Sequence, residues 1–362
     1  MPRCRTIFST TALFFILFTL LPVTPRTTSA AEVVQTPEVT IFIYHRFGED
    51  KYPTTNVSME KFKEQMAYLL ANNYQVISLK RLVRLLKNEE RFPDKTAVIT
   101  IDDGYKSIYS KAWPVLKSFG FQFTVFLYIQ ATDNNYSNFL NWDEIKEMHE
   151  AGVDFQDHSY SHKRMGHRPA DLDEQAYRSW ISADLVKSSR IMMEKLGYRP
   201  RFLALPYGEY NTIVLEEAKA LGYEAIFSQD PGSVSEHTDP YLIPREPILG
   251  ETWSTIKHFE MVLNRVDLPL TDMHPSLEPL TDMQPEVFSA RILKPELYRS
   301  NSYEIYVSEL GWKRAEFDGA TASIKNNKKL TRAQNRVIVR AREKKGGRIA
   351  LRSWLLMKEV KE

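Results

Sequence analysis

Strand-like and helix-like segments alternate along most of this 362-residue chain, from about residue 32 to residue 263. Short apolar runs such as Val39–His45 and Thr96–Ile101 predict buried strands, and segments with apolar residues at helical spacing lie between them. Further strands are expected at 74–79, 122–129, 201–208 and 223–228, and helices at 58–73, 79–88, 109–120, 141–152, 181–197 and 212–222. This alternation predicts a parallel β/α domain over 32–265, open or closed into a barrel.

The pattern changes after this domain. The sequence PLTDM occurs at 269–273 and again at 279–283, and each copy is followed by one residue and a proline. We therefore expect a stiff Pro-rich linker over 266–286. Beyond it, short alternating segments predict a small antiparallel β-sandwich over 287–362, with a hairpin that turns at Gly346–Gly347.

The first thirty residues have the composition of a secretory signal peptide. Arg3 and Arg5 precede an apolar stretch at 12–23, and small residues follow up to Ala30, after which cleavage is expected. An uncleaved membrane anchor is the alternative, although the apolar stretch is shorter than the roughly 20 residues that span a bilayer. The segment also contains Cys4, the only cysteine of the chain. We expect an exported protein, periplasmic, extracellular or on the cell surface.

The charge of the chain bounds its partners. A net charge of +2 is nearly balanced and does not indicate a nucleic-acid partner. From Lys325 to the end, 13 basic residues stand against 3 acids. A solvated basic face explains this asymmetry, and a cell-envelope export or surface partner bound by the β domain is the alternative.

Two adjacent carboxylates mark the end of one predicted strand. Asp102 and Asp103 follow the apolar run that ends at Ile101, and Gly104 comes next and permits a turn. Neighbouring residues within a strand point to opposite faces, so both acids can face one site only if the strand ends at Asp102. One acid could cap the helix that follows, but the second needs another explanation.

Two histidines indicate a metal site near these acids. His158 and His162 are four residues apart, which would place them on one face of a helix. Together with one carboxylate they would make a three-ligand site with an open position for water. A hydrogen-bonded surface pair is the alternative. Two other strand ends carry candidates: His45 ends the first strand, and Pro206 and Tyr207 open a turn.

These segments together resemble the motifs of the polysaccharide deacetylases, metal-dependent carbohydrate esterases that remove N-acetyl groups. TIDDG resembles the family's T-[FY]-D-D-G motif, HSYSH matches H-[ST]-x-x-H, and ALPYG resembles R-x-P-[YF]. The resemblance covers roughly residues 38–260 in the family's order. In having an early histidine, His45, the chain resembles the branch of the family that acts on poly-β-1,6-N-acetylglucosamine. The implied fold is a distorted (β/α) barrel.

The resemblance implies a role for each polar residue. Asp103, His158 and His162 would be the ligands of a divalent metal, zinc by preference, with cobalt, nickel or iron as alternatives. Asp102 would be the general base that takes a proton from a metal-bound water. His45 would be the general acid that donates a proton to the leaving sugar amine.

Substrate contacts are also implied. The metal and the Tyr207 backbone N–H would stabilise the oxyanion, with Pro206 in the same turn. Trp142 fits a position that the family uses as a wall of the active site, and Tyr105 is a candidate sugar platform.

Two departures from the family pattern matter. Ala204 occupies the place of the third motif's arginine, which orients the base in most members. Arg201 and Arg245 are candidates to replace it. The late histidine motif is also unclear, and His258 competes with His45 as the general acid.

We therefore expect a hydrolase that removes N-acetyl groups from an N-acetylglucosamine polymer, with an exopolysaccharide such as poly-β-1,6-N-acetylglucosamine as the first candidate. Chitooligosaccharides and peptidoglycan are alternative substrates. The alternative from a different functional class is a catalytically weak carbohydrate-binding protein. An iron oxygenase with two histidines and one carboxylate is disfavoured because the H-x-D spacing is missing.

Overall fold

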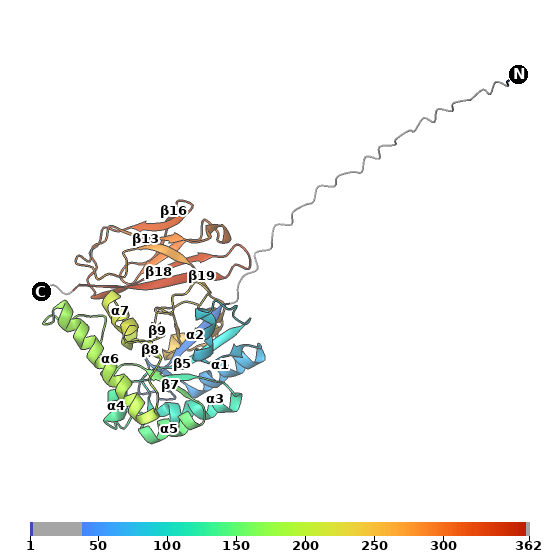
Figure 1. Ribbon diagram of the computed structural model, residues 1–362. Coiled ribbons are helices and arrows are strands. Elements are labelled where there is room, and N and C mark those ends of the chain that lie inside the picture. Colours follow the sequence, from blue (N-terminus) through green and yellow to red (C-terminus); the bar gives the residue numbers. More distant parts are fainter. Residues whose placement is uncertain (3–37, 360–362) are drawn as a thin grey trace. The chain divides into compact units, whose positions relative to one another are not determined.

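The computed structural model describes residues 1–2 and 38–359 of the chain (Figure 1). The expected signal peptide, its cleavage point and Cys4 lie outside the described residues. Among the residues described, no helix is both long enough and apolar enough to cross a bilayer.

A parallel sheet forms the centre of the first domain. Its strands run in the order β10-β1-β5-β6-β7-β8-β9, and β4 pairs with the start of β5. The bounds are β1 (Val39–Tyr44), β4 (Gln75–Val76), β5 (Thr96–Ile101), β6 (Thr124–Leu127), β7 (Asp154–Asp157), β8 (Phe202–Ala204), β9 (Ala225–Phe227) and β10 (Glu246–Pro247). All these pairings are parallel, so the carboxyl ends of the strands lie at one edge of the sheet.

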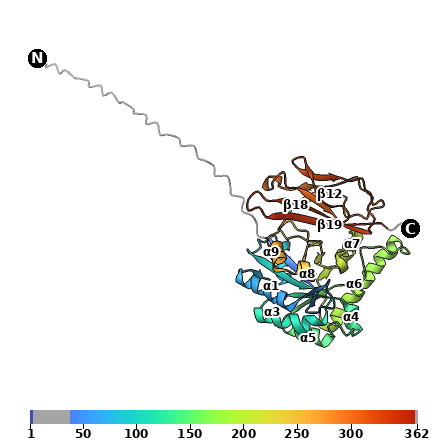
Figure 2. The same ribbon diagram turned by 180° about the vertical axis from the view of Figure 1, so that it is seen from behind.

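Helices connect these strands and lie around the outside of the sheet (Figures 1 and 2). The bounds are α1 (Met59–Ala71), α2 (Leu79–Lys87), α3 (Trp113–Phe119), α4 (Ile129–Asp133), α5 (Trp142–Glu150), α6 (Glu174–Leu196), α7 (Thr212–Ala220), α8 (Gly250–Trp253) and α9 (Ile256–Leu263). Short elements add β2 (Arg46–Phe47), β3 (Asn56–Val57), a π-helical turn η1 (Ile108–Ala112) and a 3-10 turn η2 (Pro206–Gly208). The Ser58 side chain caps α1, and α6 ends at Gly197 in the left-handed conformation.

The strands read as continuous apolar runs because both of their faces are covered. In β1, Phe42 and Tyr44 join a hydrophobic cluster with residues of α1, α3 and α9. Val39 and Ile41, on the opposite face, join a second cluster that contains the leucines of α2. Burial on both faces is typical of parallel sheets in α/β domains.

The expected α/β architecture is present, as a parallel half-barrel. The segment that contains β10 contacts both β9 and β1 and so connects the two sides of the half-barrel. Ile243 forms a parallel bridge with Phe227 of β9, and four residues later Pro247 pairs with Ile43 of β1. Arg245, between these two points, is thereby held at the same edge as the strand ends.

The C-terminal region is entirely β, with several sheets. One sheet has the order β11-β19-β18-β14-β15 and a second has β12-β13-β17-β16. The bounds are β11 (Val266–Asp267), β12 (Leu270–His274), β13 (Val287–Ile292), a 3-10 turn η3 (Pro295–Leu297), β14 (Glu304–Val307), β15 (Gly311–Arg314), β16 (Glu316–Phe317), β17 (Thr321–Lys325), β18 (Gln334–Arg342) and β19 (Ile349–Met357). Strands β18 and β19 form the expected hairpin, and residues of both sheets share one hydrophobic cluster.

The expected linker over 266–286 is wrong as a description of this segment. It contains β11, which pairs with β19, and β12, which pairs with β13. Leu268 and Met283 are buried in the cluster of the β region. The prolines suggested an unpaired chain, but prolines can flank short edge strands, and the apolar residues between them fill the core.

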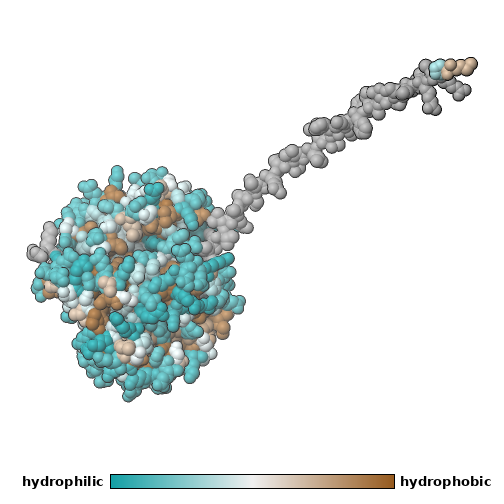
Figure 3. All heavy atoms as spheres, in the orientation of Figure 1, coloured by the Kyte–Doolittle hydropathy of each residue, from teal (hydrophilic) through white to brown (hydrophobic). Residues whose placement is uncertain are grey.

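Strand β19 joins the β region to the first domain. Leu355 and Met357 pack in a cluster with residues of α6 and α7, whereas Trp354 and Leu356 pack inside the β region. The Leu355 N–H donates to the Tyr210 hydroxyl at 2.9 Å. Figure 1 shows this strand on the side of the β region nearest to α7. Figure 3 shows the molecule from the same side as Figure 1, and the coloured residues on this side are mostly hydrophilic, with scattered apolar patches.

We predict that Tyr210→Phe lowers the free energy of unfolding by about 1–3 kcal/mol, because it leaves the buried Leu355 N–H and a buried Asp230 oxygen without their partner. Urea denaturation of the full chain measures this. The control is Tyr136→Phe, which removes a hydroxyl from an exposed side chain and should change little. Equal urea midpoints for Tyr210→Phe and wild type would contradict the prediction.

Candidate metal centre and catalytic site

Strand β5 ends just before the two acids, as the sequence suggested. The Asp102 N–H still donates to the Tyr44 carbonyl of β1 at 2.9 Å, but Asp103 has a φ of +72°. This left-handed conformation is uncommon for residues other than glycine, and it breaks the strand alternation. Gly104 continues the turn with a φ of +83°. Both carboxylates therefore face one site, with Asp102 Oδ2 4.0 Å and Asp103 Oδ1 3.4 Å from His158 Nε2.

The three expected metal ligands come together. Asp103 Oδ1 lies 3.0 Å from His162 Nε2 and 3.4 Å from His158 Nε2. The ligand atoms of all three residues lie within 4.8 Å of one another. Neither Asp103 Oδ1 nor His158 Nε2 has a well-directed hydrogen bond, although both atoms are buried. A divalent cation satisfies such a set, and zinc binds imidazole nitrogen and carboxylate oxygen at about 2.0–2.2 Å.

The neighbouring groups tune this set. Burial alone would raise the pKa of Asp103, but the adjacent imidazoles of His158 and His162 outweigh it and hold the pKa well below its usual range. His158 Nδ1 lies 2.7 Å from the Ala204 carbonyl oxygen. A donor bond from Nδ1 to this carbonyl leaves Nε2 as the ligand atom, which is the usual outer-shell arrangement for a metal-binding histidine.

The helical placement of His158 and His162 is wrong. Both lie in the loop after β7, where Ser159 and His162 have φ values of +68° and +52°. Within the loop, the Ser159 hydroxyl accepts from the His162 N–H at 2.9 Å. The two imidazoles converge because of this left-handed turn. Their four-residue spacing does not come from a helix.

Two buried acids that the sequence analysis did not single out hold this loop. Asp157 accepts from the Ser159 N–H at 2.8 Å, and burial raises its pKa to about 6. Asp184, on α6, accepts from the Tyr160 N–H at 2.8 Å and from the Ser161 N–H at 3.1 Å. A signal for Asp184 was present in the sequence, since this acid lies between Ile181 and Leu185 in the predicted helix at 181–197 and an acid among apolar residues needs a partner.

Of the two arginines considered as replacements for the one missing at Ala204, Arg245 contacts Asp102. Its Nη1 and Nη2 donate to the two oxygens of Asp102 at 2.7 and 2.9 Å, and both residues are fully buried. Arg245 also donates to Thr100 Oγ1 at 3.1 Å and to the Ser228 carbonyl at 3.0 Å. Burial alone would raise the pKa of Asp102, but Arg245 and His158 outweigh it, so the pKa lies below the ordinary value.

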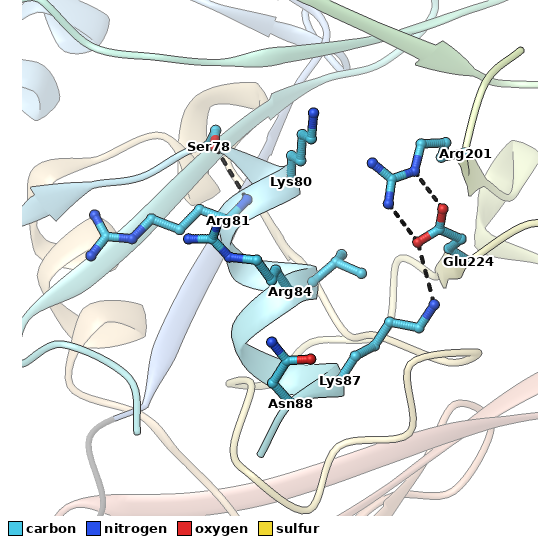
Figure 4. A pocket seen from close by; sticks show the side chains of 9 residues that line it. Ser78, Lys80, Arg81, Arg84, Lys87, Asn88, Arg201 and Glu224 are labelled. Carbon is cyan, nitrogen blue, oxygen red and sulfur yellow. Dashed lines mark hydrogen bonds and ion pairs between the residues drawn. The ribbon is translucent and has the colours of Figure 1, made fainter. Parts of the chain in front are cut away.

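The other candidate, Arg201, pairs with Glu224 instead. Figure 4 shows it at a surface pocket beside α2, where it bonds to Glu224. Its Nη2 lies 2.7 Å from Glu224 Oε2, and Lys87 reaches the same carboxylate at 3.3 Å.

One cavity of about 770 Å³ contains most of the expected site residues. Its lining includes Asp103, His162, Tyr105, Tyr207 and both candidate acids, His45 and His258. This volume is within the range of about 300–1,000 Å³ that is usual for ligand pockets.

The two candidate acids differ in their surroundings. Burial lowers the pKa of His45, and the carboxylates of Asp103 and Asp102 counter this in part. Burial also lowers the pKa of His258, to about 4, and the nearby Arg265 adds to the shift. Burial therefore favours the neutral form of both histidines, and of the two only His45 has nearby carboxylates that favour its protonated form.

The expected substrate contacts are divided. Tyr105 lines the cavity with the Arg46 guanidinium 3.4 Å from its ring centroid, and Tyr207 is about half exposed beside the His162 ring. Pro206 is buried at the start of the turn η2, which also contains Tyr207. Trp142 is not among the residues that line this cavity, because as the first residue of α5 it packs against the hydrophobic core.

Comparisons with known proteins bear on the family of the first domain. Residues 89–226 match the family described as polysaccharide deacetylase. This chain therefore carries a polysaccharide deacetylase domain, in a family of hydrolases that act on carbon–nitrogen bonds.

Particular relatives narrow the comparison. The chain is 28% identical over 221 residues to the poly-beta-1,6-N-acetyl-D-glucosamine N-deacetylase of Staphylococcus epidermidis, covering 59% of this chain and 75% of that protein. In fold it is similar to the deacetylase PplD of Streptococcus pyogenes, with a TM-score of 0.56, 21% identity, and coverage of 63% and 99%. It is also similar to IcaB of Ammonifex degensii, with a TM-score of 0.52, 22% identity, and coverage of 62% and 97%.

We predict that loss of any one ligand weakens zinc binding by more than about 100-fold, beyond the effect of an outer-shell change. Asp103→Asn, His158→Ala and His162→Ala should each emerge from gel filtration without zinc after loading, as measured by elemental analysis. Asp102→Asn should keep its zinc, because Asp102 bonds to Arg245. The control is His149→Ala, a histidine on α5 outside the ligand set. Stoichiometric zinc on Asp103→Asn would show that the assigned ligands are wrong.

Proposed function

We propose that this protein removes N-acetyl groups from an N-acetylglucosamine polymer, with poly-β-1,6-N-acetylglucosamine as the leading substrate. The family of the domain and the name of the Staphylococcus epidermidis relative support the substrate class. The observation that carries the proposal is the division between two adjacent carboxylates. Asp102 is held by Arg245, whereas Asp103 faces two imidazoles.

Asp102 is the general base in this proposal. Arg245 keeps its carboxylate ionised and fixes its plane, so the group is in the form that accepts a proton. A positioned general base contributes about 10²–10⁴-fold to a rate. Its position beside the ligand set puts it within reach of a water that attacks the acetamide carbon.

Asp103, His158 and His162 would hold the divalent metal, for which zinc is our proposal. When bound, such an ion supplies Lewis-acid activation of water and of the acetamide carbonyl.

His45 is the general acid in this proposal. Hydrolysis breaks the carbon–nitrogen bond of the acetamide and releases acetate and a free sugar amine, and this amine needs a proton. His45 lines the cavity; burial lowers its pKa, and the two acids at the end of β5 counter this in part.

Tyr105 and Tyr207 would contact the sugar, because both line the cavity beside the ligand set. The Tyr207 backbone N–H would face the developing oxyanion; the left-handed turn at φ +59° sets its direction. We also propose that the protein is exported, as its N-terminal thirty residues suggest.

We predict that the zinc-loaded full chain releases acetate from poly-β-1,6-N-acetylglucosamine, and that chelation abolishes the release. Asp102→Asn should lower kcat by about 10²–10⁴-fold while zinc remains bound, because it removes the base and leaves the ligands. Arg245→Lys should fall between this variant and wild type, since it keeps the charge and loses the paired contact.

A panel of substrates separates the alternatives. If acetate is released from chitooligosaccharides or peptidoglycan and not from the β-1,6 polymer, the proposed substrate is wrong and the proposed reaction stands. A zinc-loaded chain that binds these polymers and releases no acetate from any of them would be a carbohydrate-binding protein.

We predict that His45→Ala lowers kcat by about 10²–10⁴-fold and that His258→Ala changes it by less than about tenfold. The reason is that a general acid must carry a proton. Burial and the nearby Arg265 lower the pKa of His258 to about 4, whereas the carboxylates of Asp103 and Asp102 partly offset the effect of burial on the pKa of His45. Steady-state acetate release at saturating polymer measures both variants. A larger loss for His258→Ala than for His45→Ala would reverse the assignment.

A further inference from the structure

The cavity beside the metal ligands has a wall that the proposed reaction does not use. Tyr306, Trp312 and Arg336 line it together with His45 and Asp103. These three residues belong to β14, β15 and β18, neighbouring strands of one sheet in the β region. The C-terminal region therefore contributes side chains to the same cavity as the candidate catalytic residues.

The wall presents a fixed aromatic ring. Trp312 and Tyr306 are directly opposed in the antiparallel ladder, with ring centroids 5.3 Å apart. The Arg340 guanidinium lies over the Trp312 ring at 3.9 Å and is paired with Glu304 at 2.8 Å. Trp312 still has 40% of its surface exposed. An indole that is held by its neighbours and left open in a cavity is a suitable platform for the apolar face of a ligand.

The wall is also anchored to the first domain. Arg336 Nε donates to Asp230 Oδ1 at 2.9 Å, and the other oxygen of Asp230 accepts from the Tyr210 hydroxyl at 2.7 Å. Asp230 follows β9, so this contact ties the wall to the half-barrel that carries the metal ligands. A ligand could then contact the ring and the catalytic residues in one defined geometry.

The charges near the ring favour a neutral ligand. Arg336 is paired with Asp230 and Arg340 with Glu304, so neither guanidinium offers an uncompensated charge to an anionic polymer. A pyranose ring has the complementary chemistry, because it has an apolar C–H face for stacking and hydroxyls for polar contacts. Ser308 and the partly exposed Arg336 line the cavity close by and supply such partners.

We propose that Trp312, with Tyr306 and Arg336, forms a carbohydrate subsite. It would bind one neutral N-acetylglucosamine unit of the polysaccharide while a neighbouring unit of the same polysaccharide is deacetylated beside Asp102. This inference rests on the proposed function and extends it. The β region is then part of the polymer-binding groove, and the protein is specific for substrates of several units.

The test compares binding and turnover in the full chain. Binding is measured by calorimetry with a β-1,6-linked N-acetylglucosamine hexamer, in the zinc-loaded Asp102→Asn background so that no substrate is consumed. Adding Trp312→Ala should weaken binding about fivefold to tenfold, which corresponds to the loss of one stacked aromatic face. Trp312→Phe should recover part of the affinity. The control is Leu293→Ala, an exposed apolar residue of the β region outside the cavity, which should bind like the parent.

Turnover with the active enzyme distinguishes a subsite from a general structural effect. Trp312→Ala should raise KM for the hexamer about fivefold to tenfold and leave hydrolysis of a small aryl acetate unchanged, because that substrate cannot span to the wall. Unchanged hexamer binding in Trp312→Ala would overturn the subsite, and so would an equal loss on both substrates. If wild type releases no acetate from any polymer, the proposed function fails, while the binding comparison still decides the subsite.

Discussion

The buried ion pair between Arg245 and Asp102 is the interaction on which the site depends. Both partners are fully buried, and removal of one partner of such a pair typically costs about 3–5 kcal/mol because it leaves an uncompensated charge. The pair joins the end of β5 to the segment between β9 and β10, so it links distant parts of the half-barrel. The same contact leaves Asp103, and not Asp102, free to face the two imidazoles.

Left-handed backbone at the ends of the strands gives the site its second constraint. Asp103, Ser159, His162 and Tyr207 all have positive φ values, although none is a glycine. Such residues persist where the surrounding structure holds them, and they cluster at functional sites. Here the loop after β7 is held by two buried carboxylates, Asp157 and Asp184. The β region adds a further wall, since β14, β15 and β18 contribute side chains to the same cavity.

Much of the fold could be predicted because apolar periodicity reports burial directly. The strands at 39–45 and 96–101, their helices and the final hairpin lie where the pattern placed them. The prolines at 266–286 indicate a loop, but the segment contains two short strands that pair with two sheets. Its few apolar side chains are buried in the core of the β region. His158 and His162 were placed on a helix because their spacing fits one turn, but spacing cannot distinguish a helix from a tight left-handed loop.

The sequence by itself determined where the strands end and which polar residues stand at these ends. It did so because strand alternation and side-chain chemistry are local properties. Only the tertiary structure decided which arginine holds Asp102, since Arg245 lies 143 residues away in the chain and reaches it through the pairing of β10 with β1. The same reason applies to Trp312: its place in the cavity depends on how β19 and Arg336 fix the β region against the first domain.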